Sequence, residues 1–225
     1  MTTALRRLFL VAMPLTLAAV LWFHPGGADD ENIFEGVRED VDAWLFVHTV
    51  FLLFTPLLAI AAYVLLRGLT SAAATVSRVS LVFFLCFYTA YEVTIGLGSG
   101  VLVEYANDRP ASEQAVLADA IKHYNQNDIL GDPMSVSLAL GLLGWVVAML
   151  AASVAFRKAG AGWPQTALVA LSAFIAIHPP PVGPVALAFF AAAAVLDERR
   201  RAQDSPAVPD RPVAEVTVAP DAIAT

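Results

Sequence analysis

The chain has 225 residues, of which 58% are hydrophobic and only 15% are charged, and its formal net charge at pH 7 is −7. Soluble domains carry charged residues at about 25% of positions, so this composition excludes an ordinary soluble domain and favours a membrane protein. The negative net charge also excludes a nucleic-acid partner, which would require a basic face. The frequent use of Ala and Arg and the rarity of Lys favour a bacterial origin.

Six apolar stretches predict membrane-spanning helices. A helix needs about 20 apolar residues to cross a hydrocarbon core of about 30 Å. The predicted spans cover residues 5–23, 43–66, 79–103, 135–156, 163–177 and 182–196. Because proline fixes φ and lacks a donor, HPPPVGP at 178–184 leaves room only for a tight turn between the last two. We therefore expect an all-α integral membrane protein whose domain, residues 1–200, holds six transmembrane helices in three antiparallel hairpins.

Basic residues predict the orientation of these spans, because Lys and Arg gather in cytoplasmic loops. With six spans, one side holds Arg6, Arg7, Arg67, Arg78, Arg157, Lys158, Arg199, Arg200 and Arg201. The other side holds two acidic loops in which the basic residues are Arg38, Arg109 and Lys122. We expect a multi-pass plasma-membrane protein with both termini in the cytoplasm. The tail, 201–225, is rich in Pro, Ala, Val and Asp and is expected to be disordered.

The first span has an alternative interpretation. Arg6, Arg7, the apolar core and GGA at 26–28 also resemble a signal peptide cut after Ala28. The apolar core is long for a signal and the site lacks the A-x-A pattern, so we favour a retained span. Cleavage would remove His24.

The second outer loop, 101–134, is too long for a simple connection. Within it, RPASEQAVLADAIKHYNQ predicts a short amphipathic helix with Pro110 in its first turn. The apolar stripe of this helix comprises Val116, Leu117, Ala120, Ile121 and Tyr124. We expect the stripe to lie on the bilayer surface or on the outer ends of the bundle.

Glu92 lies in the middle of the third span. An ionisable residue there costs about 2.5–3.5 kcal/mol on insertion scales and generally faces the bundle interior. Steps of four residues place Tyr88, Glu92, Gly96 and Gly100 on one face, and we predict that Tyr88 hydrogen-bonds Glu92 from one turn away. Gly96 and Gly100 form a GxxxG motif, which lets a helix of the same chain or of a second copy approach closely.

The second span supplies the predicted partner of Glu92. At 1.5 Å per residue, His48 lies about 9 Å and Glu92 about 12 Å below the outer surface. Because the two spans form a hairpin, we predict a contact between His48 and Glu92. These residues and Tyr88 form a candidate site for a ligand or proton, and Glu92 is the candidate catalytic group.

The histidines suggest a metal as one candidate ligand of this site. All four fall on the outer side or in the outer half of the spans: His24, His48, His123 and His178. Imidazole and carboxylate are ordinary ligands of zinc, copper and iron, so His24, His48, His178 and Glu92 are the candidate metal set. Their spacing matches no signature such as HExxH, and interfacial histidines also cap helices.

Three functions are consistent with this pattern, and no catalytic motif decides whether the chain is an enzyme. We favour a multi-pass protein whose outward-facing His/Glu site binds or moves a small ligand, cation or proton. The second is a membrane-embedded enzyme that uses zinc, another transition metal or, as a variant, bis-His haem. The third is a structural or accessory subunit. Expected partners are the lipid bilayer and, through Gly96 and Gly100, a second copy or a membrane complex, without nucleic acid.

Overall fold

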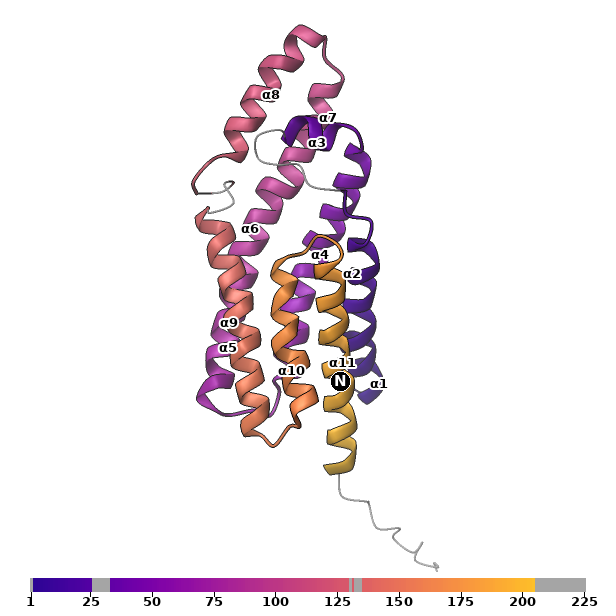
Figure 1. The fold of residues 1–225 in the computed structure, drawn as a ribbon, viewed down its shortest axis with the longest axis vertical. Coiled ribbons are helices and arrows are strands. Elements are labelled where there is room, and N and C mark those ends of the chain that lie inside the picture. Colours follow the sequence, from indigo (N-terminus) through magenta and orange to yellow (C-terminus); the bar gives the residue numbers. More distant parts are fainter. Residues whose placement is uncertain (1, 26–32, 130, 132–134, 205–225) are drawn as a thin grey trace, which may run out of the picture.

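The computed structural model describes residues 2–25, 33–129, 131 and 135–204, and the regular structure within these ranges is entirely helical. The helices form an elongated bundle (Figure 1). Within the described ranges, four helices are long and apolar enough to cross a membrane: Ala4–Leu21, Val41–Leu65, Ala72–Asn107 and Val136–Lys158. The chain is therefore an all-helical protein whose apolar helices suggest membrane association.

Two of the four candidate spans are continuous helices, and two contain π-helical turns. The continuous ones are α4 (Val41–Leu65) and α9 (Val136–Lys158). The first span joins α1 (Thr3–Arg7), η1 (Leu8–Ala12) and α2 (Met13–Leu21). The third joins α5 (Ala72–Phe83), η2 (Phe84–Tyr88), α6 (Thr89–Tyr91), η3 (Glu92–Leu97) and α7 (Gly98–Asn107).

The fifth and sixth predicted spans are helical but shorter or more charged. α10 (Trp163–Leu171) continues as the 3-10 helix η4 (Ser172–Ala176). The combined helix, Trp163–Ala176, is apolar but too short to count as a candidate membrane span. α11 (Val182–Asp204) begins apolar and ends in charged turns that contain the sequence DERRR. The count of six spans therefore stays a prediction. α11 also extends into the predicted tail, whose remainder, 205–225, lies outside the described residues, as does GGA at 26–28.

Basic residues from distant parts of the sequence meet at one end of the bundle. Arg6 donates to Oδ2 of Asp197 at 3.1 Å, which ties the first helix to α11. Arg201 donates to the carbonyl of Arg67 at 2.9 Å, which ties α11 to the connection between α4 and α5. Figure 1 shows the N-terminus at this end, together with the last turns of α11. Which side of the membrane this end faces stays a prediction.

The opposite end carries a cap made of α3 (Ile33–Arg38), α7 and α8 (Ala111–Asn125) (Figure 1). A second hydrophobic core joins them: Ile33, Phe34, Val37, Trp44, Val103, Ala106 and Ile121. At 1.5 Å per residue the helix Ala72–Asn107 is about 54 Å long, more than the roughly 30 Å of a hydrocarbon core. The excess length lets α7 carry the cap beyond the apolar part of the bundle.

The loop helix predicted from the sequence is present as α8, but its packing differs from the prediction. Leu117 and Ile121 pack on the cap core, whereas Val116 is 70% exposed. The stripe therefore packs only along the side that α3 and α7 cover. α3 was not predicted, because six residues are too few for a clear helical period.

Candidate functional site

The predicted contact between His48 and Glu92 is present. Nδ1 of His48, on α4, lies 2.5 Å from Oε1 of Glu92, at the start of η3. Both side chains are buried, with 5% of the His48 side chain and 1% of the Glu92 side chain exposed. Glu92 lies mid-helix in a candidate span, and its buried carboxyl group has a hydrogen-bonded partner. Burying such a group without a partner would cost several kcal/mol.

The Gly96 and Gly100 face packs against α4 of the same chain. A Cβ atom on Gly96 would lie 2.5 Å from Nδ1 of His48 and 2.6 Å from Oε1 of Glu92. A Cβ atom on Gly100 would lie 2.6 Å from Cδ2 of Leu45. Only hydrogen atoms fit at these two positions, so the GxxxG motif sets the spacing that lets His48 reach Glu92.

His24 and His178 join this pair, so three of the four histidines converge. The His24 ring centroid lies 5.1 Å from that of His48 and 4.9 Å from that of His178, and the other two centroids are 6.4 Å apart. His24 follows the end of α2 and His178 follows η4, each directly before a proline that favours an extended chain. His123 is exposed on α8 and stays apart.

Each converging ring has Nδ1 next to an oxygen atom. Nδ1 of His24 lies 2.8 Å from the carbonyl of Pro25, which can only accept, so this nitrogen carries the proton. Nδ1 of His48 lies next to Glu92, and Nδ1 of His178 lies 3.2 Å from the hydroxyl of Tyr88. With Nδ1 bonded in this way, Nε2 is the ring nitrogen of His24 and of His48 that stays available for a further partner.

Tyr88 therefore contacts His178, and the predicted hydrogen bond from Tyr88 to Glu92 is not found among the described contacts. η2 and η3 are π-helical, and their wider turns break the four-residue register assumed from the sequence. Tyr88 still lines the site, but from the side of His178. It links the long third helix to the turn that precedes α11.

Several buried polar atoms of the site have no hydrogen-bond partner among the described residues. They are Nε2 of His24, Nε2 of His48 and Oε2 of Glu92. Native proteins satisfy more than about 90% of their buried polar groups, so such a concentration at one point calls for an explanation. A bound ion is one of the explanations that such a cluster allows.

Burial keeps His24 and His178 neutral; they follow the ends of α2 and η4. Burial, with the neighbouring ring of His48, lowers the pKa of His24 to about 4, although its bond to Pro25 acts in the opposite direction. Burial also lowers the pKa of His178 well below its usual value, helped by His24 and His48. Both imidazoles are uncharged at pH 7, which is the form that can donate a lone pair to a cation.

Aromatic rings and one glycine fix the positions of the histidines. The Trp44 ring lies 4.3 Å from His48, and its Nε1 donates to the carbonyl of Gly96 at 2.6 Å. Phe51 lies 5.2 Å from His178. A Cβ atom on Gly183 would overlap the carbonyl of His178, so the first turn of α11 supports that residue directly. Trp44 precedes His48 by four residues, a spacing that could have identified it from the sequence.

The chain matches no protein-family model, and neither a curated protein nor a solved structure is significantly similar to it. Within the described residues, no three His, Cys, Asp or Glu side chains are close enough to hold a metal ion as they stand. The chemistry of the site therefore has to be argued from the convergence of its residues and from their unsatisfied atoms.

Proposed function

We propose that this chain is a multi-pass membrane protein in which His24, His48 and His178 bind a transition-metal cation at the capped end of the bundle. The observation that carries the proposal is the state of the ring nitrogens. Histidines that ligate a metal typically donate their other N–H to a carboxylate or a carbonyl. His24 and His48 have that arrangement, and their Nε2 atoms are buried with no partner in the part of the chain that the structure describes.

The ring spacing supports a shared ion after a small closure. With metal–nitrogen bonds of about 2.0–2.1 Å in a tetrahedral site, ring centroids lie about 5 Å apart. The separations of 4.9 and 5.1 Å from His24 match this value. The 6.4 Å between His48 and His178 is about 1 Å too wide, so these two rings would rotate inward on binding.

In this proposal Glu92 positions a ligand rather than binding the metal. Its Oε1 holds Nδ1 of His48, which orients the ring and makes Nε2 a stronger donor. Three imidazoles and an open fourth position are the arrangement of catalytic zinc sites, and copper, iron and nickel also accept imidazole. Haem between His48 and His178 is disfavoured, because the His24 ring packs against both of their rings, where the haem macrocycle would have to extend.

Metal analysis of purified protein tests the proposal. Protein prepared in detergent without chelators should contain about one zinc, copper, iron or nickel ion per chain by elemental analysis. Single alanine variants of His24, His48 and His178 should lose it, whereas His123→Ala, which changes the exposed histidine of α8, should keep it. Metal-free protein that also fails to bind added Zn²⁺ or Co²⁺ would contradict the proposal.

One observation favours a second function, the transfer of a proton. A histidine and a carboxyl group are hydrogen-bonded to each other inside the bundle, and intramembrane pairs of this kind form the proton relays of pumps and transporters. Metal-free protein in liposomes would then conduct protons, and Glu92→Gln would abolish the flux. Normal folding and no flux in metal-free protein would leave Glu92 as a structural link between helices.

A further inference from the structure

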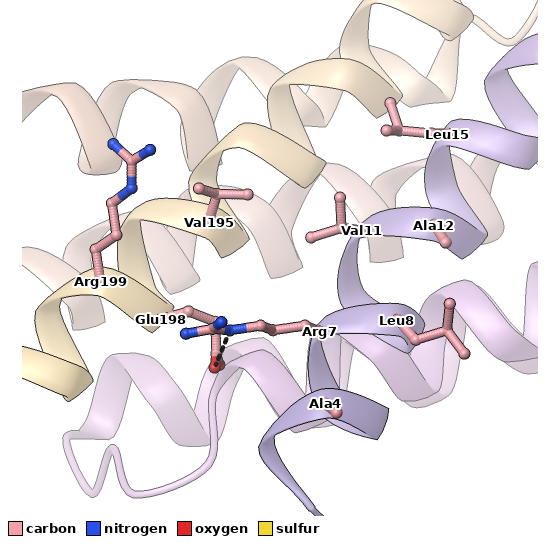
Figure 2. Close-up of a pocket in the computed structure, with 9 residues that line it drawn as sticks. All are labelled: Ala4, Arg7, Leu8, Val11, Ala12, Leu15, Val195, Glu198 and Arg199. Carbon is pink, nitrogen blue, oxygen red and sulfur yellow. Dashed lines mark ion pairs between the residues drawn. The ribbon is translucent and has the colours of Figure 1, made fainter.

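A groove runs along the outside of the bundle at its basic end, between the first helix and α11 (Figure 2). Its volume of about 660 Å³ lies in the range of small-molecule sites, roughly 300–1,000 Å³. Leu8, Val11 and Leu15 line it from the first helix, and Val195 faces them from α11. Leu8 and Leu15 are exposed and belong to a candidate span, so the groove opens toward lipid.

Two arginines stand at the end of this groove, one on each wall. Arg7 is 58% exposed, and its Nε lies 3.8 Å from Oε2 of Glu198. The other oxygen of Glu198 is already in close contact with Arg6, so Glu198 is shared between two guanidinium groups. Arg199 is exposed, and the described part of the chain shows no carboxylate paired with it. The groove therefore combines an apolar wall with uncompensated positive charge.

Both carboxylates beside the groove already have partners. Asp197 accepts from Arg6, Arg200 and Arg201. Among the side chains that the structure describes here, Glu198 pairs with Arg6 and Arg7, and Arg199 is paired with neither carboxylate. The carboxylates hold the helices together, and the charge left over is available to an anion from outside the protein.

From this geometry we infer that the groove binds an anionic phospholipid. The phosphate lies between Arg7 and Arg199, and an acyl chain lies along Val11 and Leu15. Leu15 comes eight residues after Arg7, so the apolar wall extends about 12 Å from the cations at 1.5 Å per residue. Basic pockets between transmembrane helices recognise anionic head groups in this way. A zwitterionic lipid offers the same chains without net charge and binds more weakly.

Native mass spectrometry of the full chain tests this inference. The protein is placed in nanodiscs that contain equal amounts of phosphatidylglycerol and phosphatidylcholine, and retained lipids are counted after release. The wild type should retain one phosphatidylglycerol in preference to phosphatidylcholine. The variant R7Q/R199Q should lose that preference, by roughly five-fold for each arginine removed.

Two further variants separate a specific groove from general attraction to charge. Arg67→Gln with Lys158→Gln removes the same charge from exposed positions at the basic end outside the groove, and should retain the lipid as the wild type does. Ala12→Phe places a ring in the groove and should displace the lipid while every arginine remains, a result that stands even if R7Q/R199Q does not fold. Equal retention of the two lipids by the wild type overturns the inference. Three other results also overturn it. The Arg67 and Lys158 variant could lose the preference for phosphatidylglycerol, Ala12→Phe could retain the lipid unchanged, or a second protein chain could occupy the groove.

Discussion

A double-mutant cycle on His48 and Glu92 tests the central contact of the site. His48→Phe keeps a ring of similar size between α4 and η3 but removes the Nδ1 that lies 2.5 Å from Oε1 of Glu92. Glu92→Leu removes the carboxyl group and keeps an apolar side chain. The cycle compares the free energies of unfolding of the wild type, the two single variants and the double variant.

The structure sets the expected magnitude of the coupling. Oε2 of Glu92 has no partner among the residues that the structure describes, so His48→Phe leaves both oxygens of a buried carboxyl group unpaired there. Breaking a buried pair by removing one partner costs about 3–5 kcal/mol. Because phenylalanine keeps the packing of the ring, we expect the lower end of this range, about 3 kcal/mol, for His48→Phe. A hydrogen bond to a charged group contributes about 1.5–3 kcal/mol, and we therefore expect a coupling energy of about 2 kcal/mol.

Unfolding in mixed detergent micelles, followed by tryptophan fluorescence, measures the four free energies. Trp44 serves as a local reporter because its ring lies 4.3 Å from that of His48. The control cycle pairs Glu92→Leu with His123→Phe on exposed α8, where the two effects should add. A coupling energy below about 0.5 kcal/mol between His48 and Glu92 is what independent sites give, and it would refute the hydrogen-bonded pair.

Three further predictions follow from the same structure. Gly96→Ala places a methyl group against buried His48 and Glu92 and should destabilise the protein by about 1–3 kcal/mol. The methyl group of Gly98→Ala meets only the outer end of the Tyr124 side chain, at 2.8 Å from its hydroxyl, and should cost less in a thermal unfolding assay. Asp197→Asn removes a charge that four donors share and should lower the free energy of unfolding by about 3 kcal/mol or more, measured by denaturant titration. Burial raises the pKa of Tyr124, so the stability that its protonated hydroxyl gives the cap is present below pH 10 and is lost as the pH rises through the raised pKa. Hydrogen exchange of α8 should show this alkaline loss, and Tyr124→Phe should not show it.

The contact of His48 with Glu92 was predictable because it depends on one helix pair that is adjacent in sequence. Helix rise alone gave both residues similar depths, and the glycines at 96 and 100 indicated which face of the third helix a neighbour could approach. Both arguments use local geometry, which a sequence carries. The loop helix α8 was predictable for the same reason.

The convergence of His24 and His178 on this pair was not predictable from the sequence. Their place in the cluster depends on how α2 packs between α4 and α11, and the first helix and α11 are at opposite ends of the chain. The partner of Tyr88 was missed because π-helical turns depend on tertiary packing and leave no clear periodic signal. The groove beside Arg7 was missed because it exists only where the first and last helices lie side by side.

Two buried carboxyl groups of this protein, Asp197 and Glu92, differ in how completely their oxygens are hydrogen-bonded. At the basic end, the oxygens of Asp197 accept from four side chains, so this carboxylate acts to hold helices together. At the capped end, Glu92 has one partner, and the Nε2 atoms of His24 and His48 have none among the described residues. A buried unsatisfied group costs about 1–3 kcal/mol, and a cluster of three would be a heavy burden for a purely structural link. The buried cluster at the capped end is therefore where we expect a cation to bind, whereas Asp197 joins the first helix to α11.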